Sequence, residues 1–84
     1  MKNSPSIVGI RIRERIKQRE LTVTDAAKLI GISRPVLSYI LSGHYTLSIA
    51  TAFKVQAALD LNARRLLLAQ LAEQIHHHKM LQGD

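Results

Sequence analysis

The sequence has no cysteine and no tryptophan, and only two tyrosines and one phenylalanine among its 84 residues. Without cysteine, the chain cannot form disulfides or thiolate metal sites, which fits an intracellular protein. No apolar run approaches the roughly 18 residues that a membrane span requires, and residues 1–6 lack the long apolar core of a secretion signal. We therefore expect a cytoplasmic protein without a membrane segment.

Acidic residues are also few. Six Asp and Glu stand against twelve Lys and Arg, so the formal net charge is +6. An excess of this size on a small domain favours an anionic partner. A solvated basic helix face would give the same composition, so the charge points to nucleic acid only if the chain also carries an element that reads it.

Hydrophobic residues make up 46% of the chain, although aromatic residues make up only 4%. The core must therefore be aliphatic, and the abundance of Leu, Ile, Ala and Arg favours helices over strands. The length suffices for one compact domain and not for two. Because no internal repeat or low-complexity linker interrupts the sequence, we expect an all-α fold with a single domain over residues 1–84.

Four segments begin with the same helix-start signal. In each, an apolar residue precedes a small polar residue, and another apolar residue follows four positions after the polar one, as in an N-cap with a hydrophobic staple. The polar residues are Thr22, Ser33, Ser48 and Asn62. Gly31 and Gly43 suit the left-handed conformation that ends a helix. These signals predict five helices, over residues 7–19, 23–30, 34–42, 49–59 and 63–81.

Apolar residues at helical spacing predict which helix faces form the core. We expect these residues to contribute, in chain order: Val8, Ile12 and Ile16; Ala26, Ala27, Leu29 and Ile30; Leu37, Ile40 and Leu41; Ile49, Ala52, Phe53, Val55 and Leu59; and part of the set Leu66, Leu67, Leu68, Leu71, Ala72 and Ile75.

Only Gly31, Ile32 and Ser33 separate the second predicted helix from the third. The glycine permits a sharp reversal of the chain, the isoleucine fills the corner, and the serine caps the next helix. Two short helices joined by such a turn form a helix-turn-helix, here over residues 22–43, whose second helix enters the major groove of DNA.

The exposed side of the helix over residues 34–42 suits base edges. Arg34 can donate two hydrogen bonds to guanine, Pro35 can contact a thymine methyl group, and Ser38 can bond a base or a phosphate. Tyr39 can reach a phosphate or pack on a base. Pro35 equally suits a purely structural role at a helix start, and Tyr39 one at the edge of the core. The functional role is favoured for Arg34, because a helix start disfavours a cation unless an anion is near.

Two further segments are expected to follow the phosphates of the DNA. Val23 and Thr24 begin the helix over residues 23–30, whose first amides can meet a phosphate. His44, Tyr45 and Thr46 form the loop after the reading helix, where the DNA backbone should pass. An ordinary polar connector is the alternative interpretation of this loop.

The last predicted helix carries more leucine than one face can hold. We expect Leu67, Leu68, Leu71 and Ile75 to form the interface of a homodimer. The alternative is that the whole helix packs within one chain.

Neither a metal site nor an active site is predicted. His76, His77 and His78 are consecutive, and successive helical residues point about 100° apart, so the three cannot all ligate one ion. We expect a solvated tail there and no cofactor. The sequence also contains no nucleophile elbow and no glycine-rich phosphate loop, so we expect that the protein is not an enzyme.

The stretch from Leu21 to Ser38, LTVTDAAKLIGISRPVLS, resembles the helix-turn-helix of the phage-repressor-like superfamily. Within that superfamily it is most similar to the HigA-type antitoxins, which share the run from Gly31 to Ser38 and the pair Ser42-Gly43. The resemblance extends over about residues 9–70. Two positions depart from the family pattern: Glu20 stands where glycine is usual, and Arg65-Leu66 where an aromatic residue is frequent.

This resemblance implies a five-helix lambda-repressor-like domain that binds a palindromic DNA operator as a homodimer and represses its own operon. It also implies a bacterial, nucleoid-associated protein that neutralises a co-encoded toxin. A solitary repressor without a toxin partner is the principal alternative. A third interpretation is a protein-interaction domain whose helix-turn-helix no longer binds DNA.

Overall fold

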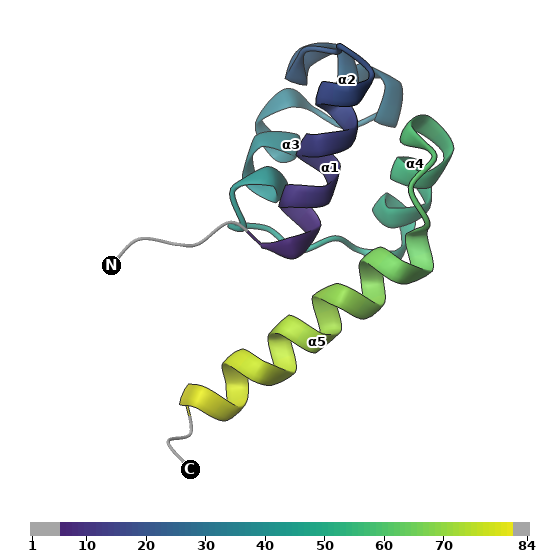
Figure 1. Ribbon diagram of the computed structural model, residues 1–84. Helices are drawn as coiled ribbons and strands as arrows, with labels where there is room; N and C mark the ends of the chain where they lie inside the picture. Colours follow the sequence, from purple (N-terminus) through teal and green to yellow (C-terminus); the bar gives the residue numbers. More distant parts are fainter. Residues whose placement is uncertain (1–5, 82–84) are drawn as a thin grey trace.

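The computed structural model describes residues 6–81, with side chains up to His76. This part contains five helices: α1 (Ile7–Gln18), α2 (Val23–Ile30), α3 (Arg34–Leu41), α4 (Ile49–Leu59) and α5 (Ala63–Leu81). In Figure 1 the first four helices gather together, and α5 leads away from the end of α4. The predicted all-α class and its five helices are confirmed, and α1 and α3 end one residue earlier than expected.

Side-chain caps begin the helices as the sequence predicts. Thr22, Ser33, Ser48 and Asn62 each accept a hydrogen bond from the backbone N–H three residues later, over 3.0, 3.3, 3.1 and 2.9 Å respectively. Ser6 caps α1 in the same way, through the N–H of Gly9 at 2.9 Å. The sequence pattern misses this cap because proline, rather than an apolar staple residue, precedes Ser6.

Left-handed residues mark where four of the helices end. Gly31 and Gly43 have φ values of +90° and +86°, as predicted. Two non-glycine residues, Glu20 and Asp60, adopt the same region, each with φ of +57°. The departure from the family pattern at position 20 therefore has a physical meaning: a glutamate occupies a conformation that glycine adopts without strain.

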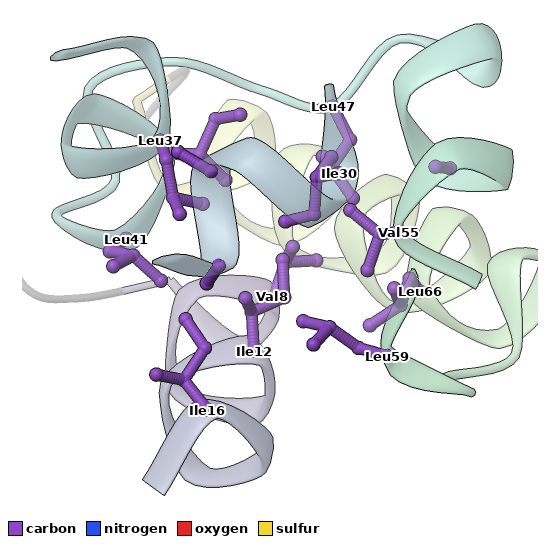
Figure 2. Packing of buried hydrophobic residues seen from close by; sticks show 14 of the residues in the cluster. Val8, Ile12, Ile16, Ile30, Leu37, Leu41, Leu47, Val55, Leu59 and Leu66 are labelled. Atoms are coloured by element: carbon purple, nitrogen blue, oxygen red, sulfur yellow. The ribbon is translucent and has the colours of Figure 1, made fainter. Parts of the chain in front are cut away.

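The core lies between the first four helices and the first turn of α5, as Figure 2 shows. The predicted inward stripes of α1 and α3 are confirmed, and so are the buried positions Ala52, Val55 and Leu59 of α4. The fully buried larger side chains are Val8, Ile12, Leu37, Leu41, Val55, Leu59 and Leu66.

Three residues that the sequence assigns to the core are exposed: Leu29, Ile49 and Phe53, with exposed fractions of 57%, 68% and 53%. Each is apolar and close in sequence to a buried neighbour. Successive helical residues point about 100° apart, so Phe53 is turned well away from Ala52 beside it. Residue type alone does not tell which flank of a short helix the neighbouring helices cover.

None of the described helices is long and apolar enough to cross a membrane. No group of three His, Asp or Glu residues within the described part of the chain is placed to hold a metal ion. The side chains of His77 and His78 lie outside the described residues.

Candidate nucleic-acid interface

The turn between α2 and α3 has the geometry that the sequence predicts. The N–H groups of Gly31 and Ile32 both donate to the carbonyl of Ala27, at 2.8 and 3.0 Å, which closes the end of α2. Ile32 is half-buried against the core, and Ser33 caps α3 immediately afterwards. Helices α2 and α3 pack on each other, so residues 22–43 form a helix-turn-helix.

Helix α3 has one buried and one open side. Leu37, Ile40 and Leu41 are buried, whereas Arg34 and Pro35 in its first turn are exposed. The Arg34 guanidinium makes no hydrogen bond or ion pair with any described residue. Because its planar donors are unoccupied, they are available to a bidentate acceptor.

Tyr39, His44 and Tyr45 form an aromatic cluster that joins α3 to the loop after it. The ring centroid of Tyr39 lies 4.9 Å from that of Tyr45 and 6.0 Å from that of His44. The carbonyl of Tyr39 accepts hydrogen bonds from the N–H groups of His44 and Tyr45, at 2.9 and 3.1 Å. Ser42 adds a contact of 2.7 Å between its Oγ and His44 Nδ1. The loop is therefore held against α3 by ring contacts and backbone hydrogen bonds.

Helix α5 fixes the other end of this loop. The side-chain amide of Gln70 accepts a hydrogen bond from the N–H of Leu47 at 2.7 Å and donates one to the carbonyl of the same residue at 2.9 Å. Leu47 itself is buried. No local sequence pattern marks this role of Gln70, because it lies 23 positions from Leu47 in the chain.

The remaining residues predicted to contact DNA differ in their exposure. Thr24 and Thr46 are exposed, and Ser38 on α3 is half-buried. Val23 packs against the core, so its side chain is directed into the protein. Any contribution of Val23 to a phosphate contact would come from its backbone amide rather than its side chain.

The basic surface is not neutralised internally. Within the described part of the chain, no Lys or Arg forms an ion pair with Asp or Glu. Glu73, for instance, accepts a hydrogen bond from the N–H of Ile7 at 3.0 Å instead. The cationic side chains of the described residues are therefore not engaged by carboxylates and can meet an anionic surface. The exposed side of α3 is the element through which such a basic protein could read DNA.

Comparisons with known proteins agree with this geometry. A family model described as helix-turn-helix matches residues 12–66, which is more than half of the chain. The chain belongs to this helix-turn-helix family. One relative is the ImmF control region 10 kDa protein of Bacillus phage phi105, 33% identical over 69 residues that span 80% of this chain and 77% of the relative.

Solved structures of helix-turn-helix proteins share the fold. SinR, described as the master regulator for biofilm formation and solved in complex with DNA, is 31% identical with a TM-score of 0.66, covering 73% of this chain and 98% of the SinR chain. The antitoxin GraA has a TM-score of 0.72, covering 96% of this chain and 95% of its own, at 23% identity, which indicates a shared fold alone. The phage-repressor-like family is thus confirmed, and the HigA branch stays a prediction.

Proposed function

We propose that this helix-turn-helix protein is a non-enzymatic transcription regulator that inserts α3 into the major groove of a specific DNA operator. The observation that carries the proposal is the unpartnered Arg34 in the first exposed turn of α3. There it can meet guanine O6 and N7. The aromatic cluster and Thr46 would follow the DNA backbone beside it, and the first turn of α2 would meet a phosphate.

We further propose that the protein acts as a homodimer through α5. On this helix Leu66, Gln70 and Glu73 face the domain: Leu66 is buried and the other two bond Leu47 and Ile7. At 100° per residue, Leu68 and Ile75 point to the opposite side. These two residues and Leu71 are 50–58% exposed, and a second copy of α5 would cover them.

Leu67 has a different place in this proposal. It is half-buried and packs against the core, so it lies at the edge of the exposed stripe of Leu68, Leu71 and Ile75. A two-fold pair of chains would present two copies of α3, and an operator would then carry two half-sites roughly 34 Å apart.

DNA binding is tested on the segment upstream of the chain's own gene. Fluorescence anisotropy would measure affinity for this segment and for random DNA of the same length, in a series of salt concentrations. Each neutralised phosphate contributes about −0.9 to the log–log slope, so we expect a slope near −5 or steeper for a dimer. A slope near zero, or equal affinity for both DNAs, would favour a protein-interaction domain instead.

Toxin neutralisation is a second candidate function. The run from Gly31 to Ser38 resembles HigA-type antitoxins, and the fold is shared with the antitoxin GraA. The solitary regulator is the alternative, and the relatives at higher identity, the ImmF protein and SinR, favour it. Co-expression with the product of the neighbouring gene separates the two. A stable complex that suppresses growth arrest by that product supports the antitoxin, whereas operator binding without such a complex supports the solitary regulator in the bacterial cytoplasm.

A further inference from the structure

A hollow of about 260 Å³ lies between α1 and the corner that joins α4 to α5. Three arginines line it: Arg11 and Arg15 from α1, and Arg65 from α5. The corner residues 60–62 and Leu66 complete the lining. None of these residues belongs to the helix-turn-helix, so the hollow is separate from the surface that α3 presents.

The arginines of this hollow differ in how they are held. Arg15 Nη1 donates to the carbonyl oxygens of Leu59 and Asp60, at 2.6 and 3.1 Å, and its Nε donates to Gln18 at 3.0 Å. Its guanidinium therefore forms a fixed wall. The guanidinium groups of Arg11 and Arg65 make no hydrogen bond or ion pair with the described residues, and their donors are unused.

The charge of the hollow is not balanced from within. Asp60 is its single carboxylate, and it forms no ion pair with the three guanidinium groups. Helix α5 begins at the same place, and the positive end of its dipole adds to the potential. Two of the first three amides of α5 are already bonded: Ala63 N–H donates to Gln56 and Arg65 N–H to Asn62, both at 2.9 Å. The arginine side chains therefore supply most of the donors that an anion in the hollow could use.

We propose that this hollow binds a phosphate group, with Arg11 and Arg65 as its bidentate donors and Arg15 as the fixed cationic wall. Guanidinium forks match the oxygen geometry of phosphate, and a hollow of this size readily holds one such group. The phosphate would come either from the DNA backbone beside the operator or from a free phosphorylated compound. Only the first source rests on the proposed DNA-binding function.

The test compares two double variants of the full chain that lose the same charge. Arg11→Gln with Arg65→Gln removes the donors of the hollow. Arg13→Gln with Arg64→Gln is the matched control, because Arg13 lies two positions from Arg11 on α1, Arg64 lies next to Arg65 on α5, and neither lines the hollow. All four side chains are exposed, so both variants should fold, which circular dichroism would check.

Inorganic phosphate is the first probe, titrated at constant ionic strength against chloride and followed by backbone amide NMR. We expect saturable shifts at residues 11 and 60–66 in the unaltered chain and in the control. Binding should be at least about tenfold weaker in the Arg11→Gln, Arg65→Gln variant. Equal shifts in both variants, or shifts that chloride reproduces, would overturn the proposal and leave only unspecific screening.

Operator binding then identifies the source of the phosphate. If the DNA backbone supplies it, the salt slope of the Arg11→Gln, Arg65→Gln variant should be shallower than that of the control by about 1. Equal slopes together with specific phosphate shifts would assign the hollow to a free compound. If no chain binds the operator while phosphate still binds the hollow, the proposed function fails and the phosphate site stands.

Discussion

Gly9 of α1 lies directly against the backbone carbonyl of Leu41 at the end of α3, so closely that a Cβ at position 9 would overlap the carbonyl oxygen. Gly9 is buried, and the two helices approach there without a side chain between them. The position of α3 relative to α1 therefore depends on the absence of a side chain at position 9.

We expect Gly9→Ala to destabilise the fold. The added methyl group meets rigid backbone, and overpacking of this kind costs about 1–3 kcal/mol. The higher helix propensity of alanine offsets at most about 1 kcal/mol of that cost. Circular dichroism should show a lower melting temperature, by roughly 4–8 °C for each kcal/mol of net loss. Glu14→Ala, an exposed change on the same helix, is the control, and equal melting of the two variants would contradict the expectation.

The contrast between Gly31 and Gly9 shows how far sequence reasoning reaches. Gly31, the side-chain caps and the inward stripe of α3 are set by residues within four positions of one another, so local patterns predict them. Gly9 and Gln70 act on residues far away in sequence, and no local pattern marks them. The prediction that Phe53 lies in the core is wrong for a related reason, because the burial of a helix face depends on how the other helices pack against it.

Glu20 provides an opportunity to stabilise the protein. It sits in the left-handed region with φ of +57°, which costs a non-glycine residue about 1–2 kcal/mol. Glu20→Gly removes that strain. The glycine also makes the unfolded chain more flexible, which lowers the free energy of unfolding by about 0.4–1 kcal/mol. We therefore expect a net gain of about 0.5–1 kcal/mol in the free energy of unfolding, measured in urea. Glu20→Ala keeps the strain and should show no gain; if it stabilises equally, the backbone conformation is not the cause.

Gln70 should prove essential to the order of the loop before α4. Replacement by alanine leaves the N–H and carbonyl of Leu47 without their partners, and an unsatisfied buried group costs about 1–3 kcal/mol. Because these groups are only partly buried, we expect a loss near the lower end of this range. Amide hydrogen exchange at residues 44–47 should accelerate. Gln74→Ala, exposed on the same helix, should leave the stability and the exchange rates unchanged. An unaltered exchange rate in Gln70→Ala would show that the hydrogen bonds between Gln70 and Leu47 do not order the loop.

The proposed dimer is tested by placing charge on the outer side of α5. Leu68→Glu with Leu71→Glu changes two exposed residues, so the monomer should fold, while an apolar seam could not form around four carboxylates. We expect monomers in sedimentation velocity and much weaker operator binding. Lys54→Gln with His76→Glu changes two exposed residues outside this stripe, shifts the net charge by the same amount, and should stay dimeric. A dimer that survives the leucine changes would place the interface elsewhere.

Arg34 allows the contributions of charge and of hydrogen-bond geometry to be separated in the proposed contact between α3 and DNA. A bidentate contact between arginine and guanine discriminates against the wrong base by about 1–3 kcal/mol. Arg34→Ala should therefore weaken operator binding by roughly ten- to a hundredfold at one fixed salt concentration, with random DNA far less affected. Arg34→Lys keeps the positive charge but lacks the planar fork, so it should recover binding to random DNA and not the preference for the operator. If lysine restores the preference, or if alanine weakens both DNAs equally, Arg34 contacts a phosphate. Specificity would then come from Ser38, Tyr39 or the shape of the DNA.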